Sequence, residues 1–235
     1  LRNLAHELNL TANLKIDLND EQIEAKAVDE LVENLEQGQP ILSWIRDYID
    51  ENIEDDKGWN VLGKIKEFGK NIFKEFYKEH EKSFNILFKD EDAFNNYTRQ
   101  LRLRRNQLQK EMNDIAQDIV KDICHNHVDD SSYFTRWLYA YINKRVNGKI
   151  TNENTPKYVT TCIENPEKWT SSKCPLLEKT TIRELASSKL CKKLQLLESK
   201  RLENWKEYQS IVLTLAHLSQ LRLLHAISNK VNEIN

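Results

Sequence analysis

The most constraining feature of this sequence is a long stretch, from Glu91 to His125, that neither glycine nor proline interrupts. Apolar residues recur along it at a spacing of three to four, which is the period of one face of an α-helix. A helix of roughly 30 residues would be ~45 Å long, closer to an arm than to a globule. The apolar stripe consists of Tyr97, Leu101, Leu108, Met112, Ile115, Ile119 and Ile123.

The same helical period fills most of the remaining chain, which has only 5 Gly and 4 Pro in 235 residues. Asn19 and Asp20 are suited to cap a helix that Gly38 ends, and Pro40 suits the first turn of the next helix. Further helical stripes run from Trp59 to Phe76, and from Thr180 to the Leu-rich segment Ile211–Val231. So few glycines argue against a parallel α/β fold.

Residues 125–177 differ, because they are rich in aromatic residues and turns. We therefore expect an all-α fold, an extended bundle of long helices with a short-helix, aromatic- and turn-rich insertion at 125–177. The pattern predicts a single domain over residues 1–235. Leu1, Leu4, Ala5 and Leu8 already follow a helical period, so we expect a fragment of a larger protein.

Composition narrows the possible functions. The formal net charge of -2 leaves nucleic-acid binding to local basic patches. No apolar run approaches the ~18 to 20 residues of a membrane helix, and no targeting pattern appears, so we expect a cytoplasmic protein without a membrane partner. The four cysteines are irregularly spaced, which favours reduced thiols over a disulfide framework.

Two motifs suggest chemistry but lack essential residues. Gly58–Lys64 matches the first seven positions of a phosphate-binding P-loop, yet Ile65 stands where Ser or Thr would hold magnesium, and an acidic helix precedes it. Cys124, His125 and His127 have zinc-ligating groups, but no second ligand pair accompanies them. We expect no catalytic, metal or cofactor site in this chain.

Basic residues interleaved with aromatic residues give the more suggestive pattern. Basic groups can bind phosphates, and exposed aromatic rings can stack on bases. The alternative is a solvated charged face with the aromatic rings in the core. The candidate nucleic-acid-binding residues are Arg99, Arg102, Arg105 and Lys110 in the long helix, and Arg136, Trp137, Tyr141, Lys144, Arg145 and Lys149 in the insertion.

Several stretches together resemble UvrD-like superfamily-one DNA helicases, and more specifically the AddA/RecB-like exonuclease V subunits of Bacteroidetes. The opening residues 1–10 (LRNLAHELNL) are similar to the segment after the early helicase motifs. Residues 53–75 resemble an acidic-Gly-x-Trp stretch followed by Leu-Gly-x-x-Leu-Phe-x-Glu. Residues 132–148 and 167–169 resemble an Asp-Phe, Tyr-Phe-x-Lys-Leu and Lys-Trp region, although Phe134 lacks the preceding acid.

This resemblance implies a 1B-type accessory domain that contacts DNA beside a motor for double-strand-break repair and recombination. The parent protein would be an ATP-dependent helicase of a kind that can also carry exonuclease activity, and it would use ATP and Mg²⁺ bound outside this chain. Its partners would be forked or single-stranded DNA, the remaining motor domains and a second helicase/nuclease subunit. The alternative is a helical protein-interaction module, such as an adaptor or effector scaffold.

Overall fold

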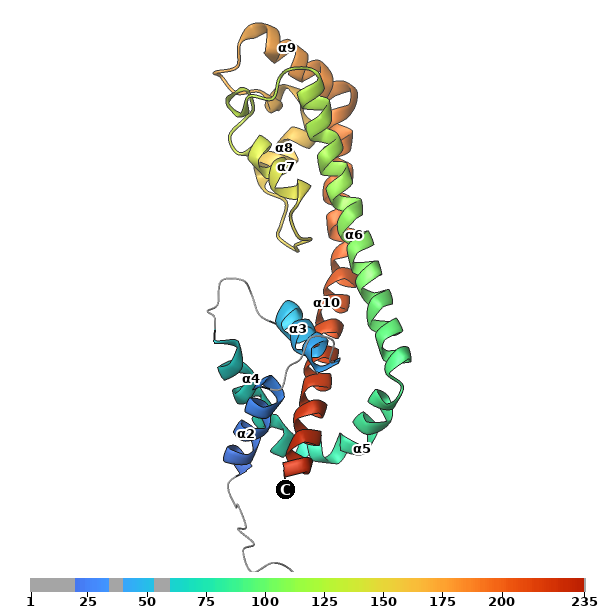
Figure 1. Cartoon of the computed structure of the whole chain (residues 1–235). Coiled ribbons are helices and arrows are strands. Elements are labelled where there is room, and N and C mark those ends of the chain that lie inside the picture. Colours follow the sequence, from blue (N-terminus) through green and yellow to red (C-terminus); the bar gives the residue numbers. More distant parts are fainter. Residues whose placement is uncertain (1–19, 34–39, 53–59, 235) are drawn as a thin grey trace, which may run out of the picture. The chain divides into compact units, whose positions relative to one another are not determined.

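A computed structural model describes residues 20–33, 40–52 and 60–234, and 86% of these residues are helical. This confirms the predicted all-α class. Among the described residues the sole β-type pairing is an antiparallel bridge between Phe134 and Thr170. The helices are α2 (Asp20–Glu33), α3 (Pro40–Asn52), α4 (Val61–Gly69), α5 (Glu75–Lys89), α6 (Glu91–His125), α7 (Leu138–Val146), α8 (Lys157–Glu164), α9 (Leu176–Leu185) and α10 (Cys191–Ile234) (Figure 1).

Short turns of other helical types join several of these helices. The 3₁₀ turns are Lys70–Phe73, Ser131–Tyr133 and Pro166–Trp169. A π-helical turn, Ala186–Leu190, lies between α9 and α10, so one continuous helical run extends from Leu176 to Ile234. The predicted opening helix and the start of the Gly58–Lys64 motif lie outside the described residues.

The chain divides into two compact units, and the prediction of a single domain over residues 1–235 stays a prediction. Unit 1 takes its residues from Leu1–Asn95 and Leu215–Asn235, and unit 2 is Asn96–Thr214. The first residues of α6 and the last part of α10 therefore belong to unit 1, and the rest of both helices belongs to unit 2. The spacing of apolar residues cannot show this division. The same spacing continues along a helix even where its first part packs in one core and its last part in another.

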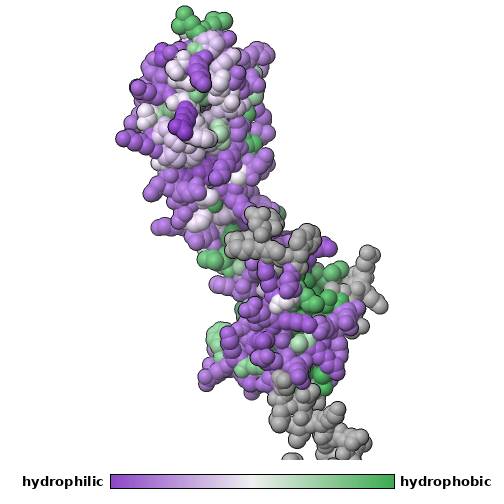
Figure 2. Space-filling view, turned by 90° about the vertical axis from the view of Figure 1, so that its left-hand side faces the viewer, coloured by the Kyte–Doolittle hydropathy of each residue, from purple (hydrophilic) through white to green (hydrophobic). Residues whose placement is uncertain are grey.

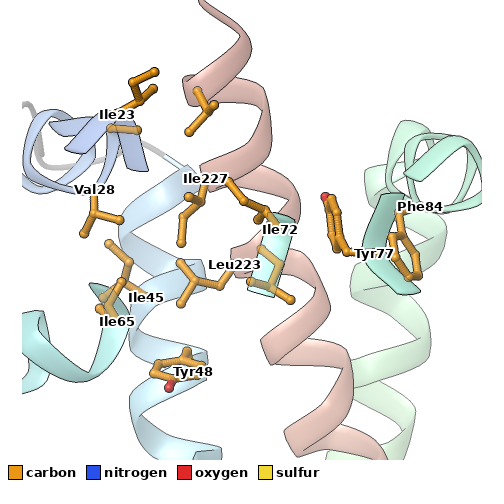
Figure 3. Packing of buried hydrophobic residues seen from close by; sticks show 13 residues of the cluster. Ile23, Val28, Ile45, Tyr48, Ile65, Ile72, Tyr77, Phe84, Leu223 and Ile227 are labelled. Carbon is orange, nitrogen blue, oxygen red and sulfur yellow. The ribbon is translucent and has the colours of Figure 1, made fainter. Parts of the chain in front are cut away.

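The core of unit 1 gathers one apolar face from each of its helices. Ile23 and Val28 of α2, Ile45 of α3, Ile65 of α4 and Ile227 of α10 point toward one another in Figure 3. Ile23, Ala27 and Val28 lie on one face of α2, and this face is buried. The cluster also contains Ala27, Tyr48, Ile72, Tyr77, Phe84, Leu223, Leu224 and Val231.

Unit 2 is built around α6 and α10, whose facing side chains are largely apolar. Met112, Ile119 and Ile123 of α6 are fully buried, as are Leu194 and Leu197 of α10. Ionic contacts fix the register of the two helices. Asp122 lies 2.6 Å from Nζ of both Lys189 and Lys193, and Arg104 binds Glu207 through two hydrogen bonds.

The elements of residues 126–175 are short, as the sequence predicted for the insertion, and they pack around one tryptophan. Trp169 is fully buried and its indole Nε1 donates a hydrogen bond of 2.8 Å to the Cys162 carbonyl. Backbone hydrogen bonds tie the chain on either side of the Phe134–Thr170 bridge. A large anchored ring therefore gives this loop-rich region a core of its own.

The run Leu176–Ile234 contains an 18-residue window with a mean hydropathy of 1.3, long and apolar enough to cross a membrane by length and composition. The expectation that no stretch reaches this level is therefore corrected. The signal is weak, because 44% of the window is buried inside the protein. In unit 1, Leu223, Ile227 and Val231 of this run are core residues, which accounts for its apolar composition.

Candidate nucleic-acid interface

The segment between Asp130 and Glu153 contains no acidic residue and holds Arg136, Lys144, Arg145 and Lys149. It forms α7 and its flanking turns in unit 2. Helix α7 buries one face, and its opposite face is exposed at Ala140, Asn143 and Lys144. Together the exposed residues Arg136, Trp137, Lys144 and Lys149 form what we call the α7 surface.

Trp137 is the most unusual residue of this surface. Its φ of 72° is left-handed, and its side chain is 61% exposed although it is large and apolar. The left-handed region costs a residue with a Cβ about 1–2 kcal/mol, and such strain clusters at functional sites. The Arg136 guanidinium lies 5.3 Å from the ring centre, a cation–π distance. An indole and a guanidinium are thus presented together to solvent.

Tyr141 and Arg145 are also on α7, but the structure removes them from the candidate surface. Arg145 is 2% exposed, and its guanidinium lies 4.8 Å from the Tyr141 ring centre. The Tyr141 hydroxyl donates a hydrogen bond of 2.6 Å to Glu198, and burial raises the pKa of that hydroxyl to about 12. The helical period could have shown this, because Leu138, Tyr141 and Arg145 share one face.

These two residues belong to a buried polar network centred on Glu198. The Glu198 carboxylate accepts hydrogen bonds from Arg201, Thr155 and Tyr141. Burial pushes the pKa of Glu198 upward, but these hydrogen bonds outweigh it and hold the pKa below its ordinary value. Arg201 is fully buried and also donates to the Thr151 carbonyl at 2.6 Å. The network holds the loop after α7 against α10.

The candidate arginines of α6 interact with other groups of the protein, which the sequence did not indicate. Arg99 is exposed and donates a hydrogen bond to Asn96 at 3.0 Å. Arg102 and Arg105 are half-buried, and each interacts with other protein groups. The fourth candidate in this helix, Lys110, is exposed like Arg99, and it lies beside a hollow.

That hollow has a volume of about 340 Å³ and lies between α6 and the end of α7. Gln109 fixes its wall, since its Nε2 donates to Asn113 and to the Gly148 carbonyl, and its Oε1 accepts from the Ile150 amide. Lys149 is therefore carried on a loop anchored to α6. The lining residues are Asn106, Gln109, Lys110, Asn113, Asp114, Gln117, Val146 and Asn147.

Sequence reasoning missed the amide side chains of this hollow. Asn106, Asn113 and Gln117 recur at helical spacing beside Lys110, and this pattern was available as a signal. Amides carry a donor and an acceptor side by side, as the edges of nucleobases do. The hollow thus adds polar groups next to the basic end of α7.

The two weaker motifs gain no chemistry from the structure. Asn60 caps α4 by accepting the Gly63 amide at 2.9 Å, so the described end of the Gly58–Lys64 motif is a helix start. His127 has a φ of 58° in the turn after α6. Within residues 20–33, 40–52 and 60–234, no group of three or more His, Cys, Asp or Glu side chains is arranged to hold a metal ion.

Comparisons with protein families, with curated proteins and with solved structures return no match to this chain. The helicase resemblance therefore rests on the sequence motifs alone.

Proposed function

We propose that this protein contacts single-stranded nucleic acid through the α7 surface of unit 2. The observation that supports the proposal best is Trp137, whose ring is exposed beside Arg136 and whose backbone has a left-handed conformation. Both residues lie in a segment without acidic residues. Burying Trp137 would have been the ordinary outcome for so large a side chain. Its exposure is explained if the ring meets a ligand.

The chemistry of the surface matches an unpaired strand better than a duplex. A base can stack on an exposed indole only when it is free of its own partner, and such stacking contributes about 1–3 kcal/mol per base. Arg136, Lys144 and Lys149 supply positive charge for neighbouring phosphates. The amide-lined hollow beside Lys110 continues the polar surface at the end of α7.

The wider role that we propose follows from the resemblance to superfamily-one helicases. Unit 2 would guide a strand of forked or single-stranded DNA as a non-catalytic accessory domain in double-strand-break repair and recombination. ATP and Mg²⁺ would act in the motor domains, which would be partners of this chain in the cytoplasm. A second helicase/nuclease subunit would join the same assembly.

A binding titration tests the proposal. A fluorescently labelled single-stranded oligonucleotide is titrated with the protein at several salt concentrations. We expect the logarithm of the binding constant to fall linearly with the logarithm of salt concentration, because bound phosphates release counterions. Trp137→Ala should weaken binding by about 5- to 150-fold, the equivalent of one stacked base.

Charge variants locate the surface. Lys144→Glu should weaken binding and flatten the salt dependence, since each lost phosphate contact removes about 0.7 from the slope for a single strand. Lys192→Glu is the matched control, because Lys192 is an exposed lysine of unit 2 outside the α7 surface. Equal losses for the two lysines, or no binding at low salt, would overturn the proposal.

A protein-interaction role remains the second candidate, because Leu176 and Leu177 at the start of α9 are 81% and 77% exposed. Figure 2 shows a largely hydrophilic unit 2 with an apolar patch at one end, the end at which Figure 1 places α9. Binding to an apolar partner would be insensitive to salt. A double Leu176→Ser, Leu177→Ser variant would lose such binding while nucleic-acid binding remained unchanged.

A further inference from the structure

Unit 1 buries a carboxyl group that no hydrogen bond stabilises. Glu24 of α2 is fully buried, and neither of its carboxyl oxygens has a hydrogen-bond partner within the part of the chain that the structure describes. An ionised carboxylate in such a place costs several kcal/mol, so the group is held neutral or leaves the core. Glu24 is not part of the α7 surface, and the motifs that resemble helicases do not include it.

The space around Glu24 is shaped to fit the carboxyl group. Gly69, the last residue of α4, lies so close that a Cβ there would collide with Oε1 of Glu24. The same Cβ would lie 3.3 Å from Cδ1 of Ile227 on α10. Ile23 and Ala27, which flank Glu24 on α2, are core residues. The carboxyl group therefore sits where α2, α4 and α10 meet.

Charged groups face this site from the neighbouring elements but do not bind it. Lys66 of α4 pairs with Asp29 at 2.6 Å. Lys70, in the 3₁₀ turn after α4, pairs with Glu21 at 3.3 Å. Further along α2, Glu30 pairs with Lys230 of α10 at 3.2 Å. Each lysine thus ties α2 to its surroundings through a surface carboxylate.

We propose that Glu24 is a pH-sensitive latch, which holds α2 in the core of unit 1 while neutral and releases it on ionisation. Deprotonation transfers the carboxyl proton to solvent and leaves a carboxylate that only water, or a lysine withdrawn from its present partner, can stabilise. Release exposes the apolar face of α2 and the part of the core that this face covers.

The direction of the response follows from the proton affinity of the buried group. Burial raises the pKa of Glu24 from 4.5 to about 7, against the opposing effect of Lys70 and Lys66. Because the folded state holds its proton more tightly, the latch is fully closed below about pH 4.5 and loses stability as the pH rises toward 7. The ratio of released to docked α2 should increase on the order of 100-fold between pH 5 and pH 8.

Amide hydrogen exchange of the whole chain tests the latch. Wild type and Glu24→Gln are compared at each pH between 5 and 8, so that the intrinsic pH dependence of exchange cancels. We expect protection of the α2 amides in the wild type to fall about 100-fold relative to the variant. Glu21→Gln, on the same helix with an exposed side chain, should leave most of this fall in place.

A second measurement does not depend on any variant folding. The ¹³C resonance of the Glu24 carboxyl group in the wild-type protein should titrate with a midpoint near 7. A midpoint at the ordinary value of 4.5 would refute the latch. Identical pH dependence of α2 protection in wild type and Glu24→Gln would refute it equally.

Discussion

The two units each bury a glutamate, and they do so in opposite ways. In unit 2, Glu198 is 5% exposed and accepts hydrogen bonds from Arg201, Thr155 and Tyr141. In unit 1, Glu24 is fully buried with both oxygens unpartnered. The pKa of Glu198 is held below its ordinary value, whereas burial raises that of Glu24 to about 7. Burial alone therefore does not decide the charge of a carboxyl group; its partners do.

This contrast matches the roles that we propose for the two units. A surface that stacks bases must be held in place, and the Glu198 network fixes the loop that follows α7. A latch must have two states close in free energy, and a carboxyl group without partners supplies them. Ordered partners make the first site rigid, and their absence makes the second responsive.

The largest expected effect comes from breaking the satisfied network. Glu198→Ala removes the partner of the fully buried Arg201, and an uncompensated buried charge costs about 3–5 kcal/mol. Urea denaturation, followed by signals from unit 2, measures the loss. Glu203→Ala is the control, because its pair with Lys200 lies on the surface, where solvent screens the attraction, and we expect a much smaller loss of stability. Similar losses in both variants would show that the buried network contributes no more to the free energy of unfolding than an exposed ion pair does.

The pH dependence of the two units should have opposite signs. Glu24 has a raised pKa, so unit 1 should lose about 3 kcal/mol as the pH rises from 4.5 to 7. Glu198 has a lowered pKa, so its contribution to unit 2 is present above pH 4.5 and is lost as the pH falls through that lower pKa. Amide exchange resolved by unit across pH 3 to 8 measures both trends. Parallel curves for the two units would contradict the comparison.

The tight packing around Glu24 predicts a smaller effect. Gly69→Ala adds a Cβ that collides with the Glu24 carboxyl group, and overpacking of this kind costs about 1–3 kcal/mol. For Gly63→Ala, in the same helix, the atoms nearest to the added Cβ belong to the side chain of Asn60, which is exposed and can move. We expect Gly63→Ala to be near neutral, since helix propensity then offsets the lost cap. Thermal denaturation of the two variants gives the difference.

The smallest effect concerns Trp137, and its sign is unusual. Trp137→Gly relieves the strain of the left-handed backbone conformation and should stabilise unit 2 by about 1 kcal/mol, while it weakens nucleic-acid binding as Trp137→Ala does. Urea denaturation and oligonucleotide titration of the same variant measure both. Destabilisation by Trp137→Gly would show that the indole ring stabilises the fold by packing, and it would contradict a role of this ring in binding a ligand.

Much of the helical architecture could be predicted because helices leave a local signal. Within the stripe predicted for α6, Leu108, Met112, Ile119 and Ile123 are buried. Leu101 and Ile115 are half-buried, and Tyr97 is 52% exposed, so the prediction fails at the start of the stripe. The burial of Tyr141 and Arg145 could also have been predicted from the helical period of α7. Their hydrogen-bond partners could not, because Glu198 lies 57 residues from Tyr141 and only tertiary packing brings the two together.

Glu24 shows a further limit of the sequence. It stands next to Ile23 and one turn before Val28, so its position on the buried face could be inferred, but a glutamate there is ordinarily expected to reach solvent or a lysine. Its isolation depends on Lys66 and Lys70 being bound to Asp29 and Glu21. The left-handed φ of Trp137 likewise has no signal in its residue type.

The π-helical turn Ala186–Leu190 has a consequence for how this chain can tolerate change. A π turn accommodates one residue more than an α turn of the same height, so it behaves as an insertion absorbed within the helix. Deleting one residue at Ser187 or Ser188 would let the run close as a regular α-helix. Because each residue turns an α-helix by about 100°, α9 would then rotate by roughly that angle against the rest of unit 2. The direction in which Leu176 and Leu177 face is thus fixed by a single extra residue.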